Sequence, residues 1–234
     1  MPPTQSTSDH NPPEITPQLL LSGYAQGVFP MAESRDDTEL HWFEPRLRGV
    51  IPLRGLHLSS SLRKAIRRND YTVRINGNFS ACVQACAARD ETWINAGLDT
   101  LYNALHMAGF AHSVEVWRKE GASAEPRMVG GLFGVTLGGA FFGESMFSTA
   151  RNTSKIALAY LIHRLNAAGF SLCDTQFLTP HLASLGGVEI PRGAYRAQLA
   201  VAIKRNAAFT APLTPTPDAL ILDLTRWATE PAQP

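Results

Sequence analysis

The chain contains little cysteine, and what it has does not form a recognisable framework. Its 234 residues include three cysteines, Cys82, Cys86 and Cys173, an odd number without the spacing of a secreted disulfide scaffold. Cys82 and Cys86 stand four positions apart, but no second pair of Cys or His ligands accompanies them, so a structural zinc site is not expected. We interpret both as small buried side chains.

Membrane, secretory and strong charge signals are also lacking. No apolar run approaches the length of a membrane span, and residues 1–17 are polar and proline-rich, without a basic or apolar signal region. The net charge is only +1, so any RNA contact would need a local basic patch. We expect a cytoplasmic protein with no membrane association, and a disordered leader over residues 1–14.

What the sequence does contain is the pattern of an α+β fold. Thr16-Pro17 is a typical helix start. Residues 127–137 and 140–147 predict the arms of an antiparallel hairpin, and residues 154–168 predict an amphipathic helix. A mainly antiparallel sheet with helices packed on it is therefore expected.

Composition along the chain suggests the domain limits. The front part is acidic and is followed by a basic segment, whereas the end of the chain is rich in proline. We expect a small N-terminal domain over residues 15–57, a larger domain over residues 58–210 and a proline-rich C-terminal tail over residues 211–234.

The first candidate functional residue is Glu144, which interrupts an apolar stretch. Phe141, Phe142 and Met146 are close to it in the sequence and should shield it from water. A buried carboxylate needs a partner or a ligand. Glu144 would either face an ammonium group from the wall of an apolar pocket or serve as a structural glutamate that is bonded to backbone or arginine.

Asp174 and Gln176 form the second candidate. They follow the apolar run Phe170–Cys173, and residues two apart on a strand point to the same face. Aspartate can orient a group or accept a proton, and glutamine can hold an amine or a carbonyl. The alternative is an ordinary pair of polar residues at the end of a strand.

Two segments could bind phosphate. The helix start at Thr153-Ser154-Lys155 could offer free N–H groups to an anion, or could be an ordinary serine cap. Residues 59–75 have a net charge of +4, with five cations and one acid. The four cations at the front of this segment, expected on one side of a helix, could bind a phosphate backbone or form a solvated face. They are Arg63, Lys64, Arg67 and Arg68.

A series of short motifs extends from about residue 17 to residue 200. They are Gly23–Pro30, His41–Pro45 with Arg48–Val50, Thr92–Ile94, Ala111–Trp117, Val129–Val135, Phe142–Ser148, Ser154-Lys155, Asp174–Gln176, His181–Gly186 and Glu189–Arg192. In this order the motifs resemble those of the bacterial leucyl/phenylalanyl-tRNA–protein transferase family.

The resemblance implies a fold and an activity. It implies a small N-terminal domain on a larger domain related to the GNAT acyltransferases. Members of the family transfer Leu or Phe from aminoacyl-tRNA to the α-amino group of proteins that begin with Arg or Lys, and the product is a degradation signal (N-end rule). No metal or nucleotide cofactor is implied.

The resemblance also implies roles for particular residues. Glu144 matches the family's pocket acid, and Asp174 and Gln176 match its polar pair at the reaction centre. Trp93 matches a tryptophan near the aminoacyl-adenosine; on its own it could equally be a core residue. The expected lining of the side-chain pocket is Leu132, Phe141 and Met146.

Two positions depart from the family pattern. Met31 stands where some members carry a tryptophan that stacks on the terminal adenine, and Ser60 stands where some carry an arginine. We therefore expect Met31 to contact the adenosine and the tRNA footprint to depend on the basic segment after Ser60.

Two other functions are compatible with parts of the sequence. An acetyl-CoA-dependent N-acetyltransferase would require a pyrophosphate loop of the type Arg/Gln-x-x-Gly-x-Gly/Ala before a helix, which the sequence lacks. A non-catalytic tRNA-binding protein would bind tRNA irrespective of the attached amino acid. The preference among Leu, Phe and Met is not predicted, and a monomer is expected.

Overall fold

The computed structural model describes residues 15–119, 121, 124–212 and 214–230. The expected leader, residues 1–14, lies outside these ranges. The helices are α1 (Pro17–Gln26), α2 (Ser60–Arg68), α3 (Phe79–Ala87), α4 (Ala96–Met107), α5 (Thr153–Ala167), α6 (Pro180–Ala183), α7 (Arg192–Ala202) and α8 (Pro217–Thr229). The strands are β1 (Phe29–Met31), β2 (His41–Phe43), β3 (Leu47–Val50), β4 (Thr72–Ile75), β5 (Ala111–Arg118), β6 (Arg127–Leu137), β7 (Ala140–Ser148), β8 (Leu172–Gln176) and β9 (Val188–Pro191).

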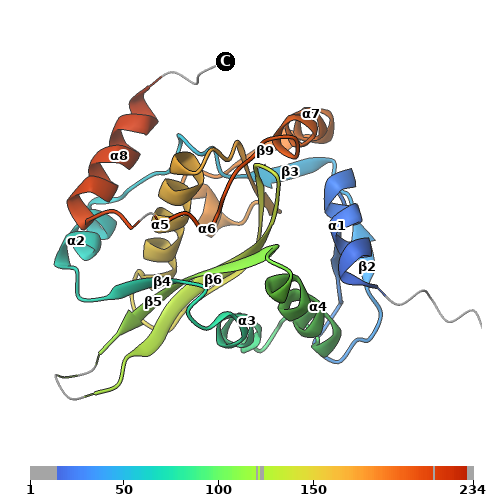
Figure 1. The fold of residues 1–234 in the computed structure, drawn as a ribbon, viewed down its shortest axis with the longest axis horizontal. Coiled ribbons are helices and arrows are strands. Elements are labelled where there is room, and N and C mark those ends of the chain that lie inside the picture. The colour runs from blue at the N-terminus through green and yellow to red at the C-terminus, as the bar shows by residue number, and fades with distance from the viewer. Residues whose placement is uncertain (1–14, 120, 122–123, 213, 231–234) are drawn as a thin grey trace, which may run out of the picture.

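One seven-stranded sheet organises the molecule, in the order β4-β5-β6-β7-β8-β3-β9. Every neighbouring pair is antiparallel except β7 and β8, which run parallel. A separate pair, β1 and β2, lies next to α1 in the N-terminal part (Figure 1). The mixed α+β class and the mainly antiparallel sheet are therefore confirmed.

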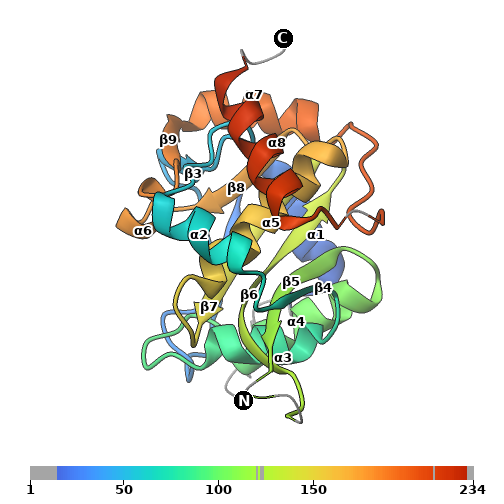
Figure 2. The same cartoon turned by 90° about the vertical axis from the view of Figure 1, so that its left-hand side faces the viewer.

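Helices cover both faces of this sheet. On one face α5 packs against the strands, and α2 and α8 pack on α5; on the other lie α3, α4 and α1 (Figures 1 and 2). Each face has its own apolar cluster, one around Leu158 and Leu161 of α5 and one around Phe133 and Phe142 of the sheet. Because α5 is sandwiched between the sheet and the outer helices, it is buried almost all round.

The parallel pair opens the sheet. β7 and β8 are paired only where Ala140–Phe142 faces Leu172–Asp174, and they are not paired beyond that point. Two β-bulges lie at this opening. Gly143 and Ser145 of β7 pair with consecutive residues of β6, which leaves Glu144 as the extra residue, and Asp174 and Gln176 of β8 flank an extra Thr175 opposite β3. Bulges bend strands and redirect side chains, so the backbone itself places these residues at the opening.

The ends of the chain differ in part from expectation. The expected N-terminal domain, residues 15–57, contributes β3 to the main sheet, between β8 and β9. Its limit at residue 57 stays a prediction. The segment expected only as a proline-rich tail contains α8, which begins with the same Thr-Pro signature as α1: Thr216 caps it and Pro217 occupies its first turn.

Candidate active site

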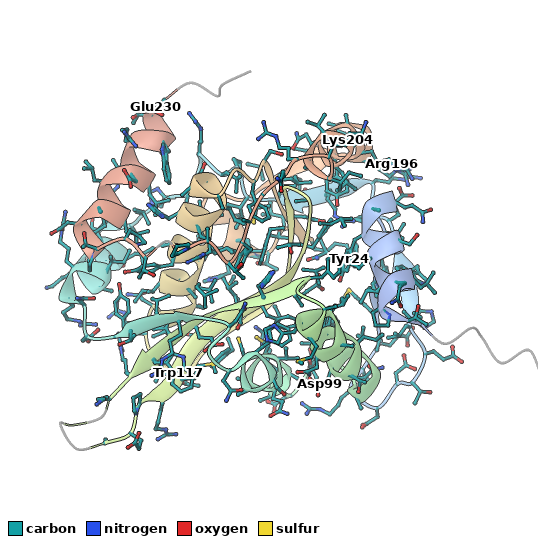
Figure 3. The ribbon with its side chains drawn as sticks, viewed as in Figure 1. Tyr24, Asp99, Trp117, Arg196, Lys204 and Glu230 are labelled. Atoms are coloured by element: carbon teal, nitrogen blue, oxygen red, sulfur yellow. The ribbon has the colours of Figure 1, made fainter. Side chains whose placement is uncertain are left out.

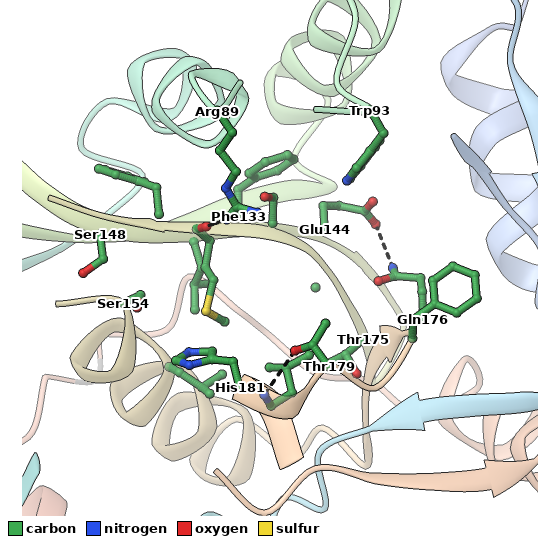
Figure 4. Close-up of a pocket in the computed structure, with 18 of the residues that line it drawn as sticks. Arg89, Trp93, Phe133, Glu144, Ser148, Ser154, Thr175, Gln176, Thr179 and His181 are labelled. Carbon is green, nitrogen blue, oxygen red and sulfur yellow. Dashed lines mark hydrogen bonds between the residues drawn. The ribbon is translucent and has the colours of Figure 1, made fainter. Parts of the chain in front are cut away.

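A cavity of about 790 Å³ occupies the opening between β7 and β8. Residues 143–149 form one wall, and the segment from Thr175 to Leu182 forms the other (Figure 4). Leu158 and Leu161, from the middle of α5, also line the cavity. Met31 and Trp93 approach from the N-terminal part and from the segment before α4. The cavity therefore joins segments that are far apart in the sequence.

Glu144 presents its carboxylate to this cavity and is held by two tyrosines. Tyr24 of α1 donates to Oε1 at 2.8 Å, and Tyr102 of α4 donates to Oε2 at 2.7 Å. Tyr24 points from α1 towards the sheet (Figure 3). Burial, and then the Glu144 charge, raise the pKa of both tyrosines well above the ordinary value. Both hydroxyls therefore stay protonated and act as donors.

Burial makes Glu144 a weak acid. Loss of hydration raises its pKa to about 7, whereas the two tyrosine hydrogen bonds and the more distant Arg48 act in the opposite direction. The negative charge of Asp174 adds to the increase. Glu144 is therefore close to half-protonated at neutral pH, which is unusual for a carboxyl group and typical of functional sites.

Gln176 lies beside Glu144, and its carboxamide can be seated in two ways. With Nε2 towards Glu144, it donates to Oε1 at 3.4 Å (Figure 4). Turned over, the nitrogen donates to the backbone oxygens of Gly143 at 2.8 Å and Thr175 at 3.0 Å. The first orientation suits the carboxylate, and the second suits a protonated Glu144 that can donate to the amide oxygen. Gln176 has a φ of 58°, so its side chain turns out of the strand alternation into the cavity.

Asp174 is fully occupied by buried partners. Arg48 donates to Oδ1 at 2.8 Å through Nε and to Oδ2 at 2.6 Å through Nη2. Tyr195 donates to Oδ2 at 2.7 Å, and the backbone N–H of Gln176 donates to Oδ1 at 2.9 Å. Asp174 has no exposed surface and does not line the cavity. Asp174 is thus brought to the site but does not face it.

Arg48 links this carboxylate to the N-terminal part of the chain. Its guanidinium carbon lies 4.5 Å from the ring centroids of both Phe29 and Tyr195, and Nη1 donates to the backbone oxygen of Gly27 at 2.9 Å. Loss of hydration alone would lower the Arg48 pKa, but Asp174 more than compensates and raises it. The bidentate, stacked geometry is one that only arginine provides.

The expected apolar lining is found in part. Leu132 and Met146 line the cavity, together with Leu158, Leu161 and Cys173, which the sequence did not single out. Phe141 does not. It is fully buried in the same apolar cluster as Leu132 and Met146, stacked on Phe209 at 5.6 Å between ring centroids. We therefore correct its assignment from pocket to core.

Met31 and Trp93 both line the cavity, and their contact with an adenosine stays a prediction. Trp93 also packs edge-on against Tyr102, with 6.4 Å between ring centroids. The indole thus supports one of the two tyrosines that hold Glu144.

The four basic residues of α2 lie outside the cavity, and they differ in whether their side chains are paired with other residues. Arg63 donates to the Thr225 hydroxyl of α8 at 2.8 Å, Arg67 pairs with Asp218 at 3.3 Å and Arg68 pairs with Asp70 at 3.1 Å. Lys64 is exposed. Two of the four charges are therefore paired with acids, Arg67 with Asp218 of α8 and Arg68 with Asp70, while Arg63 is held on α8 by a neutral hydroxyl.

Four side chains at the centre were not selected from the sequence: Tyr24, Tyr102, Arg48 and Tyr195. Tyr24 and Arg48 fall inside short motifs of the chain, so their neighbourhoods were marked but their roles were not. Nothing in the local sequence indicates that a tyrosine on α1 and another on α4 meet at one carboxylate.

The fold and the cavity together define a class of protein. An apolar hollow with one weakly acidic carboxylate and one carboxamide at its wall suits a small substrate that carries both an apolar side chain and an amino group. Such a site is typical of enzymes that act on amino acids or their esters.

Comparison with known proteins identifies the family. The profile described as "Leucyl/phenylalanyl-tRNA protein transferase" matches residues 50–200, and that of its N-terminal domain matches residues 13–46. A leucyl/phenylalanyl-tRNA–protein transferase of Ruegeria sp. (strain TM1040) is 56% identical over 88% of this chain and 96% of its own length. One of Dinoroseobacter shibae is 52% identical over 89% and 91%, respectively. The chain belongs to the leucyl/phenylalanyl-tRNA–protein transferase family.

Among solved structures, the crystal structure of FemX is a distant match, with a TM-score of 0.46 and 12% identity over 68% of this chain and 59% of that one.

No helix among the described residues has the length and apolar character needed to cross a membrane.

Proposed function

We propose that this protein transfers Leu or Phe, and also Met, from aminoacyl-tRNA to the α-amino group of proteins that begin with Arg or Lys, and so marks them for degradation. The observation that supports it most directly is the cavity in which Glu144 and Gln176 lie beside apolar side chains. Family membership supports the tRNA donor and the protein acceptor.

The donor amino acid fits the cavity by charge and shape. Glu144, in its charged form, would bind the donor's α-ammonium group, and Leu132 and Met146 would contact its side chain. An apolar pocket of this kind favours unbranched-at-β side chains such as Leu and Phe over charged ones. Met31 and Trp93 would contact the terminal adenosine.

The chemistry needs positioning more than activation. The donor is an ester, so no ATP is required, and the acceptor amine has an ordinary pKa of about 8. The amine attacks the ester carbon, the bond to the ribose oxygen breaks, and the amine's proton leaves for solvent or for that oxygen. Gln176 would orient the amine, and holding both reactants together supplies much of the rate.

Asp174 takes a different part from the one that the sequence suggested. Because all its hydrogen-bonding positions are occupied by Arg48, Tyr195 and Gln176, we propose that it is a positioning residue. It holds the backbone of Gln176 and does not contact the amine itself.

Further features complete the proposal. Arg63, Lys64, Arg67 and Arg68 would contact the tRNA backbone, with Lys64 the most accessible of them. We also propose that the larger part of the fold is of the GNAT type, that the protein is a cytoplasmic monomer and that it uses no cofactor. The motif order and the mixed α+β sheet support the GNAT relationship.

A transfer assay tests the proposal. Purified protein is mixed with labelled leucyl-tRNA and with peptides that differ only in their first residue. We expect labelled product with Arg and Lys, and little with Ala or Glu. Binding of leucyl-tRNA without any product would instead support a non-catalytic tRNA-binding protein, and product formed only from acetyl-CoA would support an N-acetyltransferase.

A further inference from the structure

The cavity has a second polar end, which the transfer chemistry described above does not use. Ser148, Ser154 and His181 lie there, on the other side of the cavity from Glu144 and Gln176 (Figure 4). Ser148 is four residues beyond Glu144 on β7, which corresponds to roughly 13 Å of extended strand. The two ends are therefore separated by about the length of an aminoacylated nucleotide.

The first turn of α5 begins at this second end and is not capped by a side chain. Its N-cap residue, Asn152, has a φ of 69° and makes no side-chain capping hydrogen bond. The next N–H, of Thr153, is bonded to the Ala150 oxygen. The N–H groups of Ser154 and Lys155 have no acceptor among the described residues. Free N–H groups at the start of a fifteen-residue helix attract anions.

The Ser154 hydroxyl is a second, independent sign of a ligand. Ser154 is only 7% exposed, it lines the cavity, and it makes no side-chain hydrogen bond to any residue that the structure describes. The hydroxyl oxygen is not among the fully enclosed polar atoms without a partner, so it keeps accessible surface inside an otherwise enclosed residue. Its accessible surface faces the cavity, so a bound group there would supply the missing bond.

The charges at this end favour an anion. Lys155 carries a positive charge on the first turn of α5, and His181 lines the cavity. Burial, and then the charge of Lys155, lower the pKa of His181, so its imidazole is neutral. Within the described part of the chain, the only carboxylate that lines the cavity is Glu144, at the opposite end. The charge of Lys155, a neutral His181 that can donate one N–H and a free helix terminus therefore meet no acidic side chain at this end among the described residues that line the cavity.

We propose that the first turn of α5, with Ser154 and Lys155 and with His181 opposite, binds the phosphate that links the donor's terminal adenosine to the rest of its RNA. The inference rests on the proposed function, since it assigns a contact to the same donor. Ser154 supplies its hydroxyl and N–H, Lys155 supplies its N–H and its charge, and the helix dipole adds to both. Glu144 and α5 would then fix the donor at its two ends.

Minimal donors isolate this contact. We compare 3′-O-leucyl-adenosine with 3′-O-leucyl-adenosine 5′-monophosphate as donors to an Arg-starting peptide, and measure the ratio of their kcat/KM values. In the unmodified protein the 5′-phosphate should raise kcat/KM roughly tenfold, the size of one charge-assisted contact at a helix terminus. In Lys155→Ala and Ser154→Ala the ratio should fall towards one.

Matched variants control for charge and for the loss of a hydroxyl. Lys204→Ala removes a cation at the end of α7 (Figure 3), and Ser171→Ala removes an exposed hydroxyl before β8. Both should keep the tenfold ratio. A ratio near one in the unmodified protein, or the same ratio in all four variants, would overturn the phosphate site.

A binding measurement separates this inference from the proposed function. Amide NMR signals of Ser154 and Lys155 are followed during titration with adenosine 5′-monophosphate, adenosine and inorganic phosphate. We expect both signals to shift with the monophosphate and to be unaffected by adenosine, with inorganic phosphate giving weaker shifts. Equal shifts with adenosine and with its monophosphate, or no shifts with either, contradict the site. Absence of transfer from leucyl-tRNA would overturn the proposed function alone, because these shifts do not depend on it.

Discussion

Glu144, half-buried at the cavity wall, and Asp174, which is fully buried, are two carboxylates on either side of Gln176, and their surroundings are opposite in kind. Asp174 is neutralised by an arginine, accepts four hydrogen bonds and has no exposed surface. Glu144 has no cation in contact among the described residues, accepts from two neutral tyrosines, and faces the cavity. Asp174 has its charge and hydrogen bonds satisfied by the protein itself, whereas Glu144 has no cationic partner until a substrate binds.

This difference separates stability from function within a single site. A buried ion pair is costly to break because the remaining charge has no partner. A carboxylate that burial has made weakly acidic is instead an unfavourable charge that a cationic ligand can stabilise. We therefore expect Asp174 to matter first for folding and Glu144 first for the reaction. The predictions below test that division, from the largest expected effect to the smallest.

Removal of the Asp174 carboxylate should have the largest effect on stability. Asp174→Ala leaves the guanidinium of Arg48 buried between two rings, and we expect the free energy of unfolding to fall by about 3–5 kcal/mol. Urea unfolding measures it. The double variant Arg48→Met/Asp174→Ala, in which no charge is left behind, should recover part of the loss. A loss of less than about 1 kcal/mol in Asp174→Ala would contradict the role of a structural ion pair.

Glu144 should make the protein less stable as the pH rises, which is opposite to the effect of a carboxyl group whose pKa is lowered by folding. Its pKa in the folded protein is about 7, against an ordinary value of 4.5, so between these values the folded state binds more protons than the unfolded state. The contribution of protonated Glu144 to the free energy of unfolding is fully present below about pH 4.5, and it is lost as the pH rises through 7. The expected loss is roughly 2–3 kcal/mol, allowing for solvent in the cavity.

The comparison with Glu144→Gln isolates this contribution. The variant cannot ionise at this position, so the difference in unfolding free energy between it and the unmodified protein should change across pH 4.5–7. Glu39→Gln, which changes an exposed carboxylate, serves as the control and should show no such change. A constant difference for Glu144→Gln would mean that Glu144 is an ordinary acid.

Some of this division could be anticipated from the sequence, and some could not. Glu144 stood out because a lone acid interrupts an apolar strand, but that local signal left open whether it faces a pocket or is a structural glutamate. The β6–β7 hairpin and the α1 start were also predictable, because turn and cap residues act locally. Strand alternation, by contrast, predicted that Asp174 and Gln176 face the same way, whereas the extra Thr175 lies between them and only Gln176 lines the cavity.

The residues that bond to the two carboxylates are distant from them in the sequence, and no local sequence pattern indicates these contacts. Arg48 and Asp174 are 126 positions apart in the sequence, and Tyr24 and Glu144 are 120 apart. Periodicity reports which residues are buried but not which of them meet. Only the folded chain shows that Asp174 is fully bonded, and hence that it is a positioning residue. The helix α8 was missed for another reason: its prolines dominated the composition, whereas Thr216-Pro217 carried the helix signal.

Loss of the Glu144 charge should reduce transfer while leaving the fold intact. In Glu144→Gln we expect kcat/KM for leucyl transfer to fall about 100-fold, the size reported for removal of one polar group aimed at a reacting centre. Unfolding free energy at pH 7 should not decrease, because a neutral amide is less costly to bury than a carboxylate. Glu39→Gln should retain full activity. Wild-type transfer by Glu144→Gln would remove Glu144 from the reaction.

The smallest effects should come from the tyrosines, and they should differ in kind. Tyr195→Phe removes one of four hydrogen bonds to Asp174, so we expect unfolding free energy to fall by about 1 kcal/mol and the pH profile of transfer to stay in place. Tyr24→Phe removes a bond that lowers the Glu144 pKa. The pH at which Glu144 ionises should therefore rise, and with it the acidic limb of kcat/KM for transfer. If Tyr195→Phe moved that limb and Tyr24→Phe did not, the two carboxylates would have exchanged the roles assigned to them here.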